Sequence, residues 1–494
     1  DGDSGRGGDR RSSPGGPPAA LLIFIFCGNL LFHGGHLYSV DDETHFRVIR
    51  SLVERGSWSV EPVKEKHLNL VRGRDGRFYA YYAPATSIVG IPFYLVGRSA
   101  ARLLRLPERF LTRACFSLQG VFWSLLTAGL LFVLLRRLGA TQTEAVLLVL
   151  LHNFGTYSFM GFRTVTTNFP VGTFLLSALY CSTGEVRTRS AFLAGLCLGG
   201  AFLYRYDALL FLPIFVLACA RRGGGRAGAG VVAGLIPAVV VVGVHNGIRF
   251  GEWWVTGSPD TANLFRGDFF EGFWGLTFGP NRGLIWYSPL SVAGLFGLAY
   301  LKRKHPEIAV PALLCFIVQL LFASSLSVWN GGAAWGPRHL GAVVPLLSLG
   351  LWPLWKDSKH WAKVLGVSSA IMLQLFASTV STDSWNDLLW DHGIPYEASW
   401  STFRYNPWYG HFQLWKRLEF ERLPAKYRFG RTRVPVGATP PNQRLRKSLD
   451  YWWVYAWKLG VPLWGILPFF LILVLGMCGA GVLLWRDATN WSKI

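Results

Sequence analysis

Long apolar runs separated by short polar segments are the main pattern of this chain. A helix needs about 20 predominantly apolar residues to cross the hydrocarbon core of a bilayer. Thirteen runs are candidates for such helices: residues 21–38, 80–97, 113–135, 142–160, 168–183, 190–204, 208–220, 227–247, 286–301, 307–327, 340–355, 363–380 and 460–485. The pattern predicts an all-α membrane protein, a polytopic helical bundle.

Basic residues between the runs predict the orientation of the bundle. Arg6, Arg10 and Arg11 precede the first run, which favours a cytoplasmic N-terminus by the positive-inside rule. Further basic clusters place the C-terminus on the same side. Because both ends then lie inside, the number of spans must be even. We therefore expect about 12 spans in the cell (inner) membrane, with 80–97 or 142–160 lying flat, re-entering or merging with a neighbour.

The same pattern divides the chain into four parts. They are a disordered cytoplasmic tail (1–19), a polytopic membrane domain (20–380) with an outer loop (41–79), an outer-face segment (381–458), and a last span with a cytoplasmic tail (459–494). The outer-face segment is rich in Trp. Its aromatic side chains are expected either to line an acceptor groove or to rest on lipid headgroups.

Composition excludes several classes of protein. With 51% hydrophobic and 16% charged residues, the chain is not a soluble enzyme. The formal charge is +21, but the basic residues lie mostly in short loops and no nucleic-acid-binding motif accompanies them. We therefore expect membrane lipids as partners and no nucleic acid. All seven cysteines fall within or beside apolar runs without metal-ligand spacing.

Three consecutive acids, Asp41, Asp42 and Glu43, follow the first apolar run. Carboxylates are costly in lipid, so these must face water, a cation or a substrate. Apolar residues at helical spacing between Phe46 and Val53 predict an amphipathic interfacial helix directly after them. The alternative is a solvated helix N-terminus whose acids complement the helix dipole.

Cationic residues occur in the segments predicted to face outward with these acids. They are Arg163, Arg205, Arg282, Arg338 and His339. Each one alone is explained by a local ion pair or by a side chain reaching the interface. Together they form a cationic surround suited to the phosphate of a lipid carrier.

A carboxylate beside a lipid-linked phosphate suggests glycosyl transfer. A general base removes the proton from an acceptor hydroxyl as it attacks the anomeric carbon, and arginines stabilise the departing phosphate. A single displacement inverts the configuration and needs only one base. A divalent metal is optional, and no Asp-x-Asp motif lies near the site, so we expect no cofactor.

Three motifs then carry a family resemblance: NGIRFG (246–251), PNRGLIWYSP (280–289) and WGPRHL (335–340). With the first span and its acids, their order resembles the GT-C class of integral-membrane glycosyltransferases. The closest group is the protein O-mannosyltransferase-like (family 39-type) bacterial enzymes that use polyprenyl-phosphate sugars. The resemblance covers residues from about 20 to about 355.

The resemblance implies that Asp42 is the catalytic base and Glu43 its neighbour, with Asp41 as an extra acid that competes for the role. The acceptor would be a glycan, lipid or protein hydroxyl, contacted by Asn168 and Tyr206. Where the family often has another acid, this chain has Thr166-Thr167-Asn168, and an amide is not a base. A transporter or flippase of a lipid-linked or anionic solute, and a non-catalytic membrane scaffold, are the alternatives.

Overall fold

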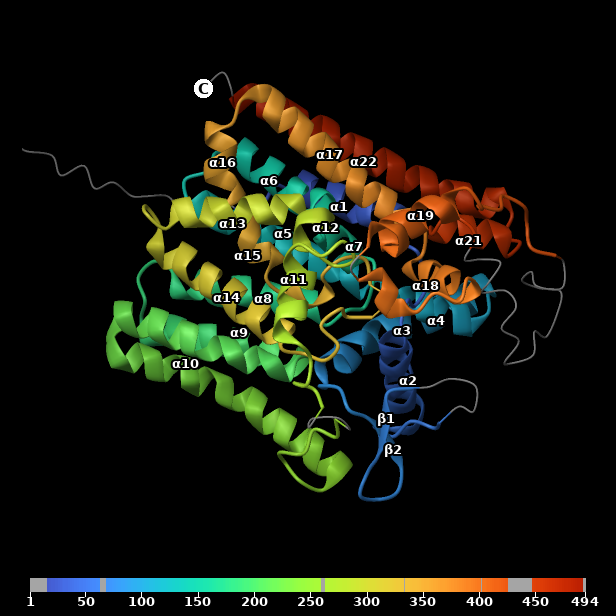
Figure 1. Cartoon of the computed structure of the whole chain (residues 1–494), viewed down its shortest axis with the longest axis horizontal. Coiled ribbons are helices and arrows are strands. Elements are labelled where there is room, and N and C mark those ends of the chain that lie inside the picture. Colours follow the sequence, from blue (N-terminus) through green and yellow to red (C-terminus); the bar gives the residue numbers. More distant parts are fainter. Residues whose placement is uncertain are drawn as a thin grey trace, which may run out of the picture.

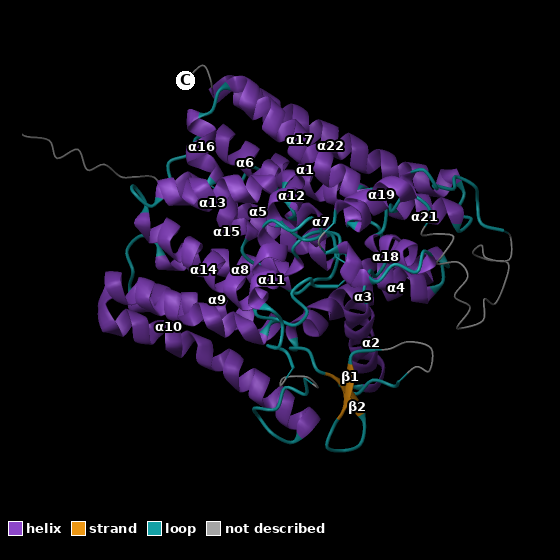
Figure 2. Cartoon of the chain, in the orientation of Figure 1, coloured by secondary structure: helices purple, strands orange, loops and turns teal. Residues whose placement is uncertain are grey.

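The computed structural model describes residues 16–62, 68–258, 263–332, 334–400, 402–424 and 447–491. Helices make up nearly all of the regular structure, and the described residues contain one two-stranded sheet (Figure 2). The all-α fold expected from the apolar pattern is therefore confirmed. Most of the predicted tail at 1–19 lies outside the described residues.

The N-terminal part contains α1 (Ala19–Leu31), α2 (Val40–Arg55), β1 (Leu70–Arg72), β2 (Phe78–Ala80) and α3 (Ala85–Leu104). The hydroxyl of Ser39 caps α2 by accepting a hydrogen bond from the backbone N–H of Asp42 at 3.1 Å. Gly56 ends α2 in the left-handed region, with φ 63°. β1 and β2 pair antiparallel around residues 73–77. The predicted amphipathic helix is thus present, but the three acids form its first turn rather than preceding it.

Figure 1 shows α2 running across the direction of the long helices of the bundle. Its apolar residues Phe46, Val48 and Ile49 are buried, whereas Arg50 and Glu54 lie toward solvent and pair with each other. A helix with one apolar and one charged face is suited to the membrane interface rather than to a span.

The first half of the bundle contains α4 (Glu108–Ser117), α5 (Gln119–Arg137), α6 (Gln142–Gly155), α7 (Ser158–Phe162), α8 (Asn168–Ser182), α9 (Thr188–Tyr204), η1 (Tyr206–Phe211) and α10 (Leu212–Phe250). Gly224, with φ 75° and ψ 179°, interrupts α10 and separates the two apolar runs predicted there. Glycines let α9 and α10 pack closely: a Cβ on Gly195 would lie 2.0 Å from the carbonyl oxygen of Val231.

The second half contains α11 (Phe269–Thr277), α12 (Leu284–Tyr287), α13 (Pro289–Leu301), α14 (Pro306–Ser324), η2 (Arg338–Leu340), α15 (Val344–Ser348), α16 (Leu351–Asp357) and α17 (His360–Ser378). The C-terminal part contains α18 (Thr382–Asp391), η3 (Tyr396–Ser399), η4 (Phe403–Tyr405), α19 (Pro407–Trp415), α21 (Trp452–Lys458) and α22 (Leu463–Trp491). α22 packs on α1, which joins the two ends of the chain (Figure 1).

Five helices in the described residues are long and apolar enough to cross a membrane. They cover Glu108–Arg137, Tyr206–Phe250, Pro306–Ser324, His360–Ser378 and Leu463–Thr489, with shorter apolar helices at Ala19–Leu31 and Pro289–Leu301. The surface of α22 is rich in exposed apolar side chains, such as Leu467, Ile472 and Leu475, as expected for contact with lipid. The count of about 12 spans stays a prediction.

The aromatic residues of 381–458 divide between the interior and the surface. Trp385 is buried, and Trp400 and Trp408 pack against the main core. Trp390 and Trp415 are exposed. Much of this aromatic content therefore builds a protein core, a role that neither expectation for the segment included.

Candidate active site

A pocket lies where the start of α2, the end of α7, the segment before η2 and the start of α18 meet. Its lining includes Tyr38, Ser39, Asp42, Tyr157, Met160, Arg163, Thr164, Thr166, Ala334, Trp335, Arg338 and Thr382. One of the three predicted acids and two of the predicted arginines therefore share one pocket. Convergence of carboxylate and guanidinium groups was the central expectation from the sequence.

Asp42 is 2% exposed, and its carboxylate is bound by residues that precede it in the chain. Its carboxylate accepts a hydrogen bond from the backbone N–H of Tyr38 at 3.0 Å and from the hydroxyl of Ser39 at 2.9 Å. Burial raises the pKa of Asp42 above its usual value, and the two hydrogen bonds oppose this shift. A carboxylate with a raised pKa is better suited to accept a proton near neutral pH than an ordinary one.

Asp41 has different partners. Tyr82 donates its hydroxyl to Asp41 Oδ1 at 2.5 Å, Asn69 donates to the same oxygen at 2.8 Å, and Arg338 pairs with Oδ2. Burial alone would raise the pKa of Asp41, but the charge of Arg338 and these hydrogen bonds lower it to about 2. Asp41 is therefore a fixed anion and a weak base.

Glu43 turns away from the pocket toward two arginines. Arg113 on α4 donates to both carboxylate oxygens at 2.9 and 3.0 Å, and Arg47 donates at 2.8 Å. Glu43 therefore links α2 to α4. Because Asp42 and Glu43 are 2% and 6% exposed, the alternative of a solvated helix N-terminus is wrong for these two acids.

Arg163 lines the pocket but is held largely by the C-terminal part of the chain. Its guanidinium donates to the backbone carbonyl of Asp450 at 2.5 Å, to the Asp450 carboxylate at 3.1 Å and to the carbonyl of Phe32 at 2.7 Å. Arg163 is therefore largely occupied by protein partners.

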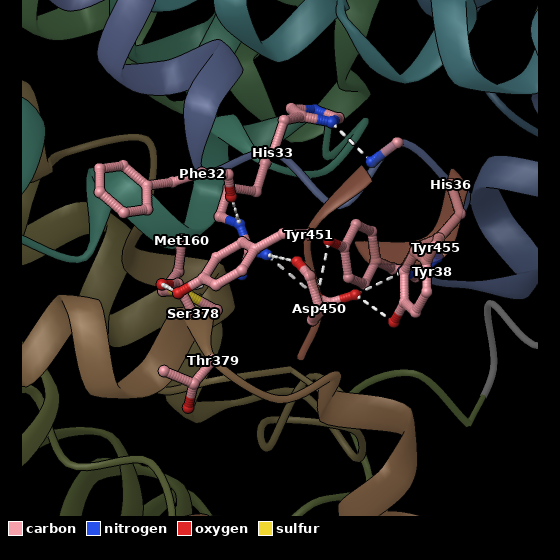
Figure 3. Close-up of polar contacts among 12 residues, drawn as sticks. Phe32, His33, His36, Tyr38, Met160, Ser378, Thr379, Asp450, Tyr451 and Tyr455 are labelled. Carbon is pink, nitrogen blue, oxygen red and sulfur yellow. Dashed lines mark hydrogen bonds and ion pairs between the residues drawn. The ribbon is translucent and has the colours of Figure 1, made fainter. Parts of the chain in front are cut away.

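Asp450 is fully buried and gathers further hydrogen bonds from the N-terminal segment. Tyr38 and Tyr455 donate their hydroxyls at 2.8 and 2.7 Å, and His36 Nε2 lies 2.7 Å away (Figure 3). Burial alone would raise the pKa of Asp450, but His36, Arg163 and these hydrogen bonds hold it below its usual range. Tyr38 thus contacts Asp42 through its backbone and Asp450 through its side chain.

Arg282 and Arg205, two of the cations predicted at the phosphate, do not line this pocket. Arg282 is fully buried and donates to the carbonyls of Asn330 and Asn281 at 2.8 and 2.9 Å, to the carbonyl of Gly332, and to the hydroxyl of Tyr396 at 2.6 Å. Backbone carbonyls thus occupy its donors. Arg205 makes a two-point ion pair with Asp207, both bonds at 2.9 Å.

His339 is nearly buried and does not line the pocket, although its neighbour Arg338 does. Its Nε2 is 3.1 Å from the carbonyl of Val328. Burial and the nearby charges of Arg205 and Arg338 lower the pKa of His339 to about 3, so the ring is neutral at physiological pH. A neutral, buried imidazole does not supply positive charge to a phosphate.

The two residues predicted to contact the acceptor also lie outside the pocket lining. Tyr206 accepts a hydrogen bond from Arg249 at 3.4 Å, and Arg249 is itself buried against the carbonyls of Ala80 and Tyr82. Asn168 is buried at the start of α8, and neither side-chain polar atom has a hydrogen-bond partner in the described structure. Thr166 from the same segment does line the pocket.

Sequence reasoning missed Tyr38, Trp335 and Asp450. Trp335 is the first residue of the WGPRHL motif, three positions before Arg338. Asp450 is a lone acid directly before a Tyr-Trp-Trp stretch and the last apolar run, and that position was the available signal. In the described part of the chain, no group of three or more His, Cys, Asp or Glu side chains is arranged to hold a metal ion.

Distant likenesses to solved structures accompany this geometry. ArnT from Cupriavidus metallidurans, in the crystal structure with undecaprenyl phosphate, is 13% identical, with a TM-score of 0.48 over 94% of this chain and 75% of that one. The oligosaccharyltransferase of Archaeoglobus fulgidus, tethered to an acceptor peptide, is 13% identical, with a TM-score of 0.44 over 75% of this chain and 56% of that one. No curated protein sequence matches the chain.

One family model matches part of the sequence. Residues 112–245, from α4 to near the end of α10, match the dolichyl-phosphate-mannose-protein mannosyltransferase family. This match agrees with the family resemblance stated from the sequence, and the three motifs that carried that resemblance follow the matched residues.

Proposed function

We propose that this protein is an inverting glycosyltransferase that moves a sugar from a polyprenyl-phosphate carrier to an acceptor hydroxyl at the outer, periplasmic face of the cell membrane. One observation carries the proposal: Asp42, a buried carboxylate with a raised pKa, shares a pocket with the guanidinium of Arg338. The family match over residues 112–245 supports the lipid-phosphate sugar as donor.

In the proposed reaction, Asp42 takes the proton of the acceptor hydroxyl as its oxygen attacks the anomeric carbon. The new carbon–oxygen bond forms as the bond to the phosphate oxygen breaks, and the electron pair leaves with the phosphate. Arg338 stabilises the negative charge on that leaving group. The products are a glycoside of inverted configuration and the polyprenyl phosphate. The step needs no metal or other cofactor.

Asp41 acts on Arg338 in this scheme rather than on the acceptor. It holds the guanidinium at the pocket through the ion pair, and its own lowered pKa makes it a poor proton acceptor. Arg163 contributes positive charge nearby while Asp450 fixes its position. Of the predicted cations, Arg338 is therefore our principal phosphate ligand.

The side of the membrane on which the pocket lies follows from the same proposal. A cytoplasmic N-terminus places the end of α1, and with it α2 and the pocket, on the outer face of the inner membrane. A glycan, lipid or protein hydroxyl approaching from that side can then meet a donor whose prenyl tail stays in the bilayer.

The test is transfer by the purified chain, reconstituted with radiolabelled polyprenyl-phosphate sugars and envelope glycan, lipid or protein fractions as acceptors. We expect Asp42→Asn to abolish transfer and to keep donor binding within about twofold of the unchanged protein. Undiminished turnover in that variant would remove Asp42 from the mechanism. Movement of the intact lipid-linked sugar between leaflets, without transfer, would instead establish the transporter alternative.

A further inference from the structure

Residues 32–39, which we call the connector, join α1 to the acidic turn of α2. The last two residues of the connector bind the proposed base. The backbone N–H of Tyr38 donates to the carboxylate of Asp42 at 3.0 Å, and the hydroxyl of Ser39 donates at 2.9 Å. The position of the connector therefore decides whether these two hydrogen bonds to Asp42 can form.

Two tryptophans at the start of α21, Trp452 and Trp453, bind the end of α1 and the start of the connector. The backbone N–H of Trp452 donates to the carbonyl of His33 at 2.8 Å. The two indole N–H groups donate to the carbonyls of Leu30 and Leu31 at 2.9 and 3.1 Å. The C-terminal part of the chain thus fixes one end of the connector.

Asp450 holds the other end of the connector through two side chains (Figure 3). Its Oδ2 accepts a hydrogen bond from the hydroxyl of Tyr38 at 2.8 Å, and its Oδ1 lies 2.7 Å from His36 Nε2. Asp450 is fully buried, so these contacts are shielded from water and are stronger than they would be at the surface.

Two glycines allow the connector to lie this close to the C-terminal part. A Cβ on Gly34 would lie 2.0 Å from the hydroxyl oxygen of Tyr38 and 3.1 Å from the carboxylate of Asp450. Gly35 has a φ of 70°, and a Cβ there would lie 2.7 Å from the Cβ of Trp452. The pair of glycines in the connector is therefore required by its contact with residues far along the chain.

We propose that Asp450 is a positioning residue for the reaction, and that it acts through Tyr38 to hold Asp42 in its hydrogen-bonded, ionised form. The inference rests on the proposed function, which it extends by naming the residue that controls the base. Tyr38 makes the link because its hydroxyl binds one carboxylate and its backbone N–H binds the other. A hydrogen bond to a carboxylate favours the charged form, so displacement of the connector would favour a protonated Asp42 that cannot accept a proton.

Other groups that influence Asp42 must stay constant in a test of this link. Burial has the largest influence on the pKa of Asp42 and raises it, whereas Asp41 raises the pKa further and Arg338 lowers it. Arg163 and Tyr157 also line the pocket. Because a variant of Tyr38 that lacks only the hydroxyl keeps all of these groups, a change in the ionisation of Asp42 reports the connector.

The experiment compares Tyr38→Phe with Tyr455→Phe in the full chain in nanodiscs. Each variant removes one hydroxyl that donates to Asp450, at 2.8 and 2.7 Å respectively, so both should lower the unfolding temperature by a comparable amount. Tyr455 lies on α21 and not in the connector. It is therefore the matched control, and its variant should leave the ionisation of Asp42 unchanged.

Two midpoints are measured in each variant. Infrared spectroscopy gives the pKa of Asp42 from the carboxyl band that Asp42→Asn removes, and the acid limb of kcat/KM is recorded with the polyprenyl-phosphate sugar that the unchanged chain transfers. We expect Tyr38→Phe to raise both midpoints by about 0.5–1 pH unit, as for partial loss of a hydrogen bond to a charged group. Binding of polyprenyl phosphate should stay within about twofold. Unchanged midpoints in Tyr38→Phe, or an equal shift in Tyr455→Phe, would overturn the inference.

Gly35→Ala tests the same link without removal of a polar group. The added Cβ would clash with Trp452 and move the connector, so the midpoint should rise here too. Gly56→Ala is its matched control, because Gly56 also has a positive φ, of 63°, but a Cβ there meets no atom within 4 Å. If Tyr38→Phe does not fold, as shown by loss of polyprenyl phosphate binding, this pair decides, and equal midpoints in the two alanine variants overturn the inference.

Failure of the proposed function has a different signature. If the unchanged chain transfers no sugar to any acceptor, the infrared midpoints still compare the variants. A shift in Tyr38→Phe but not in Tyr455→Phe then supports the link from Asp450 to Asp42, while the absence of transfer counts against the proposed function alone.

Discussion

Arg338 and Asp41 form an ion pair beside the pocket, although 297 residues separate them in the chain. The guanidinium proposed to meet the donor phosphate therefore already has an anionic partner. In the proposed reaction a phosphate must share Arg338 with Asp41 or displace it, so we expect the ion pair to affect both the affinity for the carrier and the rate of its release.

Replacing Asp41 tests this competition. We expect Asp41→Asn to lower the free energy of unfolding by about 1–3 kcal/mol, between the effects typical of exposed and buried pairs, because Arg338 is left uncompensated. Polyprenyl phosphate should restore the stability, and thermal unfolding with and without the lipid measures this. Transfer should persist, unlike in Asp42→Asn. Loss of transfer in both variants would show that the two acids act together.

The pH dependence of transfer tests the role of Asp42. A free aspartate has a pKa of about 3.9, and burial raises the pKa of Asp42. Because the base must be ionised, kcat/KM should fall on acidification with a midpoint above that of a free carboxyl. Ser39→Ala removes a hydrogen bond that favours the charged form, so it should move the midpoint to higher pH. If Ser39→Ala leaves the pH profile of kcat/KM unchanged, its acid limb does not report the ionisation of Asp42.

Asp450→Asn should be strongly destabilising. The Arg163–Asp450 pair is buried, with side chains 2% and 1% exposed, and loss of one partner leaves an unpaired buried charge that costs about 3–5 kcal/mol. Glu185→Gln, in an exposed pair with Arg187, is the matched control and should cost less than about 1 kcal/mol. Equal effects in chemical unfolding would contradict a special role for Asp450.

Replacing Glu43 tests whether this acid has a structural or a catalytic role. Its partners Arg47 and Arg113 place it between α2 and α4, away from the pocket. We expect Glu43→Gln to lower the unfolding temperature but to keep the acid limb of kcat/KM where it is. If that limb shifts at a temperature where the variant is fully folded, Glu43 takes part in the reaction and its role is not only structural.

Much of the helical pattern and part of the site could be predicted because their signals are local. An acidic triplet after an apolar run, and an arginine between Gly-Pro and His, are visible without knowledge of the fold. Asp42 and Arg338 were found in this way, and they do line one pocket. The helix that contains the acids begins earlier than predicted, because Ser39 caps it.

The remaining features depend on long-range contacts. Arg282 was expected at the phosphate because Gly and Pro flank it, but backbone carbonyls of Asn330 and Gly332 occupy its guanidinium. Backbone partners leave no trace in side-chain chemistry, so the sequence could not show that these donors already have protein partners. Asp450 reaches Tyr38 across 412 residues and lies beyond the motifs that carried the resemblance.

Asp450 also determines when the site can first exist during biosynthesis. The ribosome makes this residue after α1 to α19, and until then Arg163 has no carboxylate beside it. A nascent chain that has inserted every earlier helix therefore still lacks the carboxylate that holds Arg163 at the pocket. The order of synthesis therefore delays completion of the pocket until the C-terminal part of the chain has been made.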